Sequence, residues 1–114
     1  YQLLDDANAP DGRTRLTSAA AAYGLYPSPA GSLKPAGEWN STRIVMQKNH
    51  VEHWLNGTKV VEYELWSDDW KAKVAASKFG KYPNYGLAKR GAIGFQGDHD
   101  GALALRNIRI RPLD

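Results

Sequence analysis

The chain has 114 residues, a length that suits one domain and leaves little room for two independent cores. Apolar residues make up 42% and charged residues 24%, which excludes a disordered tail, and the absence of cysteine excludes disulfide frameworks, zinc fingers, thiol nucleophiles and iron–sulfur clusters. The net charge of +3 is small for a protein that binds nucleic acid.

Two segments near the start of the chain predict strands. Residues 1–5 place two adjacent leucines between polar residues, which is typical of the middle of a sheet and not of a frayed end. Residues 19–22 are four alanines, which favour a helix by propensity. Their flanks, at 17–18 and 23–27, favour a strand, and we predict a strand here.

Residues 39–64 predict a meander of three antiparallel strands. Asn56-Gly57 separates two β-rich runs, and a dipeptide that tolerates positive φ suits a two-residue type I′ hairpin. Alternation in the middle strand predicts two faces, one with Val51, His53 and Leu55 and the other with Glu52, Trp54 and Asn56.

Residues 67–79 predict one helix of about three turns. Ser67 can cap its first turn, two aspartates follow at the positive end of the helix dipole, and Gly80 can end it. Residues 71–90 hold six basic side chains and no acidic one. Such a stripe can contact phosphates, but a solvated helix face is the commoner explanation, so we expect no nucleic-acid partner.

The last part of the chain predicts two further strands, at 91–96 and 103–111, joined by a polar turn at 97–101. Pro112 ends the pairing. The chain therefore predicts six or seven antiparallel strands and one short inserted helix at about 67–79. This pattern is typical of a mostly β protein, an antiparallel β-sandwich and not a parallel α/β sheet.

The polar turn holds the densest group of side chains that can do chemistry. It offers an amide at Gln96, a carboxylate at Asp98 and an imidazole at His99, which together can ligate a cation or hold a general base. A solvated hairpin tip is the simpler interpretation from composition, because Asp and Gly are ordinary turn residues. Gln96 favours a site, because it ends a strand on the face opposite Ile93 and Phe95. Sequence patterns for a serine nucleophile or a phosphate loop are absent.

Other candidate residues lie within the predicted strands. His53 is on an apolar face, where a hydrogen-bonded core or rim residue is commoner than a ligand. Arg106 can bind an anionic or hydroxyl-rich ligand, or cover apolar surface with its stem. Four tryptophans and six tyrosines can stack on sugar rings, although most tryptophans belong to cores. These patterns are compatible with a carbohydrate site and do not require one.

Four motifs go beyond generic β patterning. They are Gly-Glu-Trp-Asn at 37–40, His-Trp-Leu-Asn-Gly-Thr-Lys-Val-Val-Glu at 53–62, Gln-Gly-Asp-His at 96–99 and Arg-Asn-Ile-Arg-Ile-Arg-Pro-Leu at 106–113. Together with residues 1–5 and 22–27, they make the chain resemble the 3-keto-disaccharide hydrolase family over essentially its whole length. The resemblance implies a concanavalin-like jelly roll with the ligand on its concave sheet. It also implies secreted or periplasmic bacterial enzymes that act on glycosides oxidised at C3.

The resemblance implies an elimination at the sugar ring. A ketone at C3 acidifies the C2 proton, so a base can remove it and the C1 substituent can leave, followed by hydration. His99 is then the expected base or metal ligand, with Gln96 and Asp98 beside it. A divalent metal held by His99 and Asp98 is a candidate cofactor that would stabilise the enolate. The expected substrate-binding residues are Arg106, Gln2 and His53.

The resemblance also implies strands that precede residue 1, together with a glutamate just before it. Residues 1–114 are then a single, partial jelly-roll domain, completed by an N-terminal segment or by a second chain. The expected ligand is a carbohydrate, and a non-catalytic carbohydrate-binding module is the alternative function. Because the sequence has no run of 18 apolar residues and no basic-then-apolar start, we expect neither a membrane partner nor a signal peptide within this chain.

Overall fold

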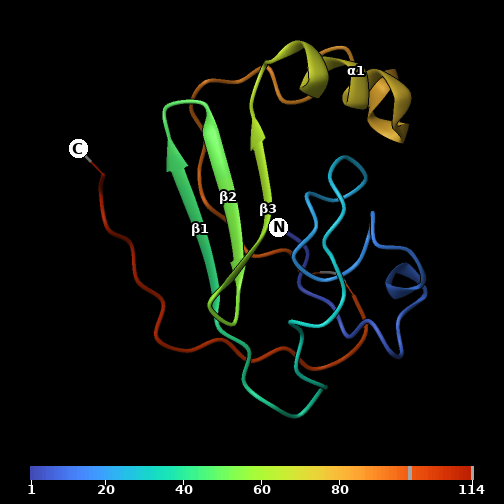
Figure 1. Ribbon diagram of the computed structural model, residues 1–114, viewed down its shortest axis with the longest axis vertical. Helices are drawn as coiled ribbons and strands as arrows, with labels where there is room; N and C mark the ends of the chain where they lie inside the picture. The colour runs from blue at the N-terminus through green and yellow to red at the C-terminus, as the bar shows by residue number, and fades with distance from the viewer. Residues whose placement is uncertain (98, 114) are drawn as a thin grey trace.

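The computed structural model describes residues 1–97 and 99–113. Its elements are the 3-10 helix η1 (Pro10–Arg13), strands β1 (Thr42–Gln47), β2 (His50–Leu55) and β3 (Thr58–Glu64), helix α1 (Asp68–Ala76) and the 3-10 helix η2 (Lys78–Lys81) (Figure 1). The strands form one antiparallel sheet in the order β1-β2-β3. The regular structure of the described residues is therefore mostly β, with one short α-helix.

The meander predicted at 39–64 is confirmed, and its second turn explains the pairing of β2 with β3. Asn56 and Gly57 both have positive φ, 50° and 83°, as a type I′ turn requires. The Asn56 side chain also ties the turn to the preceding segment. Its Oδ1 accepts the Ser41 backbone N–H at 2.8 Å, and its Nδ2 donates to the Ser32 carbonyl at 2.6 Å.

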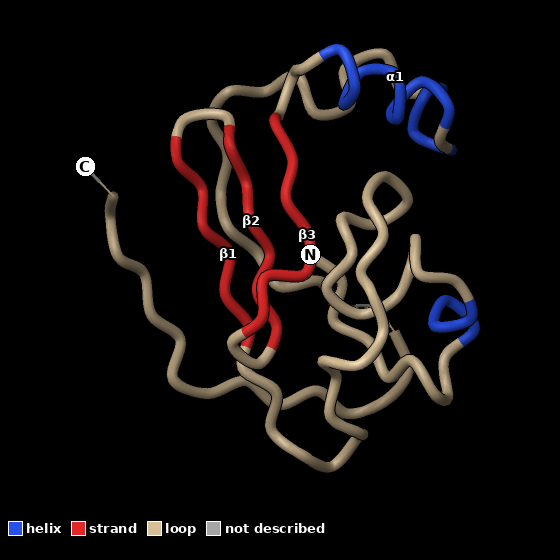
Figure 2. The backbone as a smooth tube through the Cα atoms, in the orientation of Figure 1, coloured by secondary structure: helices blue, strands red, loops and turns tan. Residues whose placement is uncertain are grey.

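The two faces of β2 differ in burial as the alternation predicts. Val51, His53 and Leu55 are buried, while the residues between them are half-buried. Val60 and Val61 of β3 join them in the core. The segment that covers this face, residues 1–33, is blue to cyan in Figure 1 and almost entirely loop in Figure 2. The core is therefore closed by turns and not by a second regular sheet.

The strands predicted at 1–5 and 19–22 are not formed as regular strands. Gln2 does pair with the alanine tract, since its N–H donates to the Ala21 carbonyl at 3.1 Å and its carbonyl accepts the Ala20 N–H at 2.8 Å. The pairing stops there because Ala20 turns the chain with a φ of 67°. All four alanines are buried, and their small side chains let this turn lie directly against the sheet.

The helix predicted at 67–79 is confirmed over most of its length. Ser67 caps α1, because its Oγ accepts the Trp70 N–H at 3.1 Å. The helix ends at Ala76, earlier than predicted, because Ser77 is extended, with φ −92° and ψ 172°, and the next turn tightens into η2. In the described part of the chain, no helix has the length and apolar character needed to cross a bilayer.

The strands predicted at 91–96 and 103–111 are absent from the described residues. The end of the chain instead runs along the outside of the molecule, orange to red in Figure 1. Its apolar side chains lie in solvent, and Ile110 is 75% exposed. A strand needs a neighbour for its backbone N–H and C=O groups, and alternation alone does not supply one. The β-sandwich and jelly roll therefore stay predictions.

Candidate functional site

Two of the three residues predicted to be catalytic are adjacent in the structure. Gln96 Nε2 lies 2.9 Å from His99 Nε2, a hydrogen-bonding distance, and both side chains are exposed. The amide nitrogen can only donate, so this contact assigns His99 Nε2 as the acceptor and places the ring proton on Nδ1. Asp98, the third predicted residue, lies outside the described residues.

Two predicted substrate-binding residues occupy separate places. The Arg106 guanidinium carbon lies 3.9 Å from the centre of the Trp39 ring, so the motif at 106–113 meets the motif at 37–40. A guanidinium held against an indole presents its N–H donors in a fixed plane, a geometry that suits oxygen ligands. Gln2 is half-buried and is fixed through its backbone to the alanine tract.

His53, the third predicted substrate-binding residue, lies in the core and is 2% exposed. Its Nδ1 lies 2.7 Å from the Ala20 carbonyl, so Nδ1 carries the proton and donates. The Tyr63 hydroxyl lies 3.4 Å from Nε2 and can donate to it. Burial lowers the pKa of His53 to about 4, so the ring is neutral at pH 7. This is the geometry of a hydrogen-bonded core histidine, the alternative weighed from the sequence.

Tyrosines enclose the His53 ring. The ring of Tyr1 lies 4.8 Å from it and the ring of Tyr63 lies 5.6 Å from it, between ring centres. Tyr63 in turn stacks on Tyr26 at 4.8 Å, and the Tyr26 hydroxyl donates to Asp69 of α1 at 2.7 Å. Burial raises the pKa of Tyr63 to about 12. The cluster therefore joins the covering segment and the sheet through neutral aromatic side chains, and it reaches α1 through the Asp69 carboxylate.

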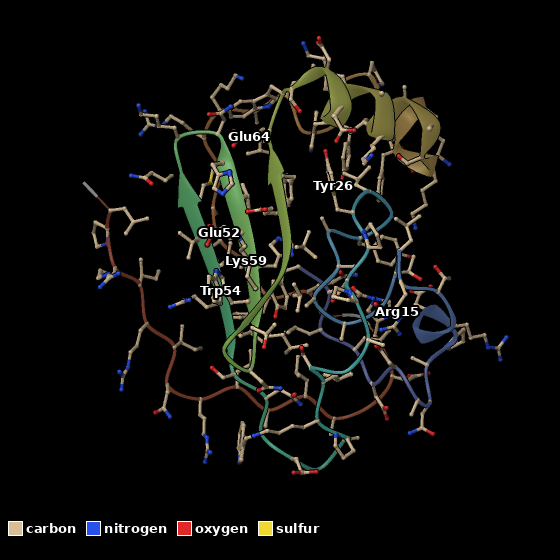
Figure 3. The ribbon with its side chains drawn as sticks, viewed as in Figure 1. Arg15, Tyr26, Glu52, Trp54, Lys59 and Glu64 are labelled. Atoms are coloured by element: carbon tan, nitrogen blue, oxygen red, sulfur yellow. The ribbon has the colours of Figure 1, made fainter. Side chains whose placement is uncertain are left out.

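The opposite face of the sheet carries a polar cluster that the sequence analysis did not recognise as a group. His50 Nδ1 lies 2.6 Å from Glu64 Oε1, and His50 Nε2 lies 3.4 Å from Glu52 Oε1. The hydrogen bond that the protonated His50 ring donates to Glu64 contributes most to a raised pKa of His50. The Trp54 indole N–H donates to Glu52 at 2.7 Å and is the main cause of the lowered pKa of that carboxyl. Figure 3 shows Glu52, Trp54 and Glu64 along the strands.

The hairpin turn alone does not predict this cluster. A two-residue turn at 56–57 pairs Leu55 with Thr58, but the register shifts by one residue between His53 and Trp54. This shift is what places Glu52 opposite Glu62 and His50 opposite Glu64. Alternation then puts these side chains on the face away from the core.

Within the described residues, His50, Glu52 and Glu62 come nearest to a set of metal ligands, with donor atoms within 4.8 Å of one another. Imidazole and carboxylates suit several divalent metals. However, the Lys59 ammonium contacts Glu62 and lies 3.8 Å from Glu52, so a cation already neutralises these carboxylates. The group fits a surface ion network better than a metal centre. Of the two predicted metal ligands, only His99 lies within the described residues, and its neighbour there is the Gln96 amide.

Comparisons with known proteins bear on all of these residues. Residues 1–111 match a family model described as a 3-keto-alpha-glucoside-1,2-lyase-like domain. A 3-keto-disaccharide hydrolase of Bacteroides thetaiotaomicron is 37% identical over 127 residues, an alignment that covers 100% of this chain and 43% of that protein. The crystal structure of a candidate glycosyl hydrolase from Parabacteroides distasonis ATCC 8503 aligns with a TM-score of 0.67 and 33% identity, over 77% of this chain and 43% of that one. This chain therefore spans less than half the length of either relative.

Proposed function

The chain belongs to the 3-keto-disaccharide hydrolase family, and from this membership we propose that it forms part of an enzyme that cleaves glycosides oxidised at C3. The names of the two relatives support a glycoside hydrolase type of function. Within the chain, the contact of 2.9 Å between Gln96 and His99 supports the proposal best, because it joins two residues of one family motif in an exposed loop.

His99 is the proposed base. It takes the proton from C2, and the electron pair of that bond forms the C2–C3 double bond of an enolate. The enolate returns to a ketone as its electron pair forms the C1–C2 double bond and the C1–O bond breaks. The leaving oxygen keeps the electron pair of the C1–O bond and takes the proton that His99 removed from C2. Water then adds across the C1–C2 double bond and releases the free 3-keto sugar. A positioned base typically contributes 10²–10⁴-fold to such a step.

The other predicted residues have supporting roles in this proposal. Gln96 orients the His99 ring, and Asp98 lies beside it in the sequence. Arg106, held against Trp39, offers N–H donors to the developing enolate oxygen. Gln2 is proposed to contact the sugar, whereas the burial of His53 restricts that residue to a position behind the binding surface. A divalent metal at His99 and Asp98 stays a candidate cofactor. It would stabilise the same negative charge on the enolate oxygen that Arg106 is proposed to stabilise.

We also propose that residues 1–114 are one part of a β-sandwich, completed by another segment of a longer protein or by a second chain. Ile44 and Met46 of β1 lie opposite core residues of β2, yet they are 56% and 51% exposed. Apolar side chains on the core side of a sheet are normally covered. The 43% coverage of both relatives leaves ample length for such a cover. A secreted or periplasmic location is proposed from the family alone.

The proposal is tested by incubating the full-length protein with a 3-keto-glucoside and measuring free 3-keto-glucose, with and without a chelator. We expect the variants His99→Ala and Gln96→Ala to lose at least about a hundredfold in turnover. His50→Gln is the control, because it removes a half-buried histidine outside the loop and should leave turnover unchanged.

Two results would contradict the enzymatic assignment. One is the absence of product from folded, full-length protein. The other is sugar binding that persists unchanged in His99→Ala, without cleavage by either protein, which is what the non-catalytic binding module predicts. Loss of activity with chelator, restored by a divalent metal, would assign the metal as a cofactor.

A further inference from the structure

An open pocket lies at the end of the sheet, where the β1–β2 turn meets the junction between β3 and α1. It is a shallow depression, open to solvent, with a volume of about 590 Å³. It is lined by Lys48, Asn49, Leu65, Trp66, Ser67 and Lys89. None of these residues belongs to the loop at 96–101 or to the motifs to which the proposed function assigns roles.

The charge of this pocket is positive. Two of its lining side chains are lysines, and none of the described lining residues is acidic. The acidic side chains that flank it in sequence are engaged elsewhere. Glu64 binds His50 at 2.6 Å, and Asp69 binds Tyr26 at 2.7 Å and Lys73 at 3.0 Å. Asp68 points into solvent with Lys71 at 3.8 Å. An anion that enters the pocket therefore meets uncompensated ammonium groups.

Trp66 holds one of these ammonium groups in place. Its φ is 64°, a left-handed conformation that is strained for a bulky residue. Glycine would satisfy the turn with less strain, so the indole itself has a use there. The indole Nε1 donates to the Gly86 carbonyl at 2.7 Å, and the Lys89 Nζ lies 3.0 Å from the ring centre. The ring thus positions the Lys89 ammonium at the pocket.

The loop that carries Lys89 is fixed independently of the pocket. Gly86 has a φ of 65°, and it packs so closely on Trp70 that a Cβ at this position would lie 2.3 Å from the indole. Its neighbour Tyr85 stacks on Phe79 with ring centres 4.3 Å apart. Lys89 follows three residues after this anchor, and the Trp66 ring is the contact that holds its ammonium at the pocket.

We propose that this pocket binds a saccharide that carries a carboxylate or a phosphate. Lys48 and Lys89 would bind the oxyanion. Asn49 has an amide that can bond sugar hydroxyls, and Leu65 presents apolar surface to the C–H face of a ring. The site is separate from the proposed catalytic loop, and its test measures binding and not turnover.

The test is a titration of the full-length protein with glucuronate, glucose 6-phosphate, glucose and inorganic phosphate, followed by calorimetry or by amide chemical shifts. We expect at least one of the two acidic sugars to bind and glucose not to bind. Comparison of glucuronate with glucose 6-phosphate then shows whether the site prefers a carboxylate or a phosphate. Lys48→Gln and Lys89→Gln should each weaken the binding about tenfold, as the loss of one charged hydrogen bond predicts. The control is Lys71→Gln, an exposed lysine outside the pocket, which should bind like the parent protein.

Three outcomes would overturn the proposal. The first is that neither acidic sugar binds. The second is that inorganic phosphate binds as tightly as the acidic sugars, which would show a bare anion site. The third is that Lys71→Gln loses as much affinity as the pocket variants, which would show non-specific charge attraction. Both pocket lysines are exposed, so circular dichroism is expected to show folded variants. Binding that survives in His99→Ala would support a separate site, and its loss there would contradict one.

Discussion

The buried state of His53 predicts that acidification destabilises this fold. Its pKa is about 4 in the folded chain, against 6.5 for a histidine in water. Above pH 6.5 both the folded and the unfolded chain hold the ring neutral, so the ring contributes no pH dependence. Between pH 6.5 and 4 the unfolded chain binds a proton and the folded chain does not, so the free energy of unfolding falls with falling pH.

The magnitude follows from the difference between the two pKa values. Each unit of pH in this window costs about 1.4 kcal/mol, so the loss at pH 5 is about 2 kcal/mol relative to pH 7.5. The full loss, reached near pH 4, is about 3 kcal/mol. His53 is 2% exposed, so solvent screening reduces these figures little.

The assay is urea denaturation followed by tryptophan fluorescence at pH 7.5 and pH 5, with the ring titrated in parallel by NMR. The variant His53→Asn keeps a donor for the Ala20 carbonyl but cannot titrate. Its free energy of unfolding should therefore fall between pH 7.5 and pH 5 by about 2 kcal/mol less than that of the parent protein. His50→Gln is a comparison of opposite sign. The pKa of His50 is raised, mainly by Glu64, so its stabilisation is fully present below pH 6.5 and is lost as pH rises through the folded pKa. Its removal should therefore not reduce the loss of stability at pH 5. A parent protein and a His53→Asn variant with the same pH dependence would refute the reasoning.

Two further substitutions test the backbone geometry. Gly86→Ala should cost more than about 2 kcal/mol of unfolding free energy, because the added Cβ meets Trp70 at 2.3 Å and the residue has a φ of 65°. A stability equal to that of the parent protein would show that the loop is not anchored at Trp70. Asn56→Ala should lower the free energy of unfolding by about 2 kcal/mol. It removes the hydrogen bonds to Ser41 and Ser32, and it forces an alanine to adopt a φ of 50°, which asparagine tolerates better. A loss below about 0.5 kcal/mol in urea denaturation would contradict that role.

The elements predicted correctly are those whose signals are local. The hairpin at 56–57 needs only a dipeptide that accepts positive φ and a strand on each side, and the cap of α1 needs only a serine before two aspartates. The faces of β2 follow from the pleat alone, which is why the burial of Val51, His53 and Leu55 was predictable.

The elements predicted wrongly depend on partners that a local pattern does not specify. Four alanines in a row carry no alternation that would distinguish a strand from a buried turn. The structure shows a turn, because Ala20 has a φ of 67°. The tail at 103–111 alternates as a strand does, but Ile108 and Ile110 are 63% and 75% exposed, with no strand beside them in the described residues. Strand pairing needs two segments, and the pattern within one segment does not show which other segment it will pair with.

The candidate site shows the same division. The contact between Gln96 and His99 joins residues three apart in one loop, a separation that the sequence places within reach. The pocket at Trp66 and Lys89 was not predictable, because it depends on a left-handed tryptophan and on a carbonyl twenty residues away. The polar cluster around His50 lies between these cases. The hairpin was predicted, but the register shift between His53 and Trp54, which places His50 opposite Glu64, was not.

The three histidines of this chain differ in their fitness for acid–base chemistry, and parity along one strand explains two of them. His50 and His53 are three residues apart in β2, so they lie on opposite faces. His53 is neutral but enclosed, with Ala20 and Tyr63 at its two ring nitrogens. His50 reaches solvent, but it is held by carboxylates that stabilise its charged form and raise its pKa, so a smaller share of the ring is in the neutral form that can take a proton from a substrate. His99 is exposed and its Nε2 contacts a neutral amide, so a substrate that displaces this amide meets an accessible lone pair. Among the three histidines, His99 is therefore the one whose exposure and neutral partner suit the role of base proposed for it.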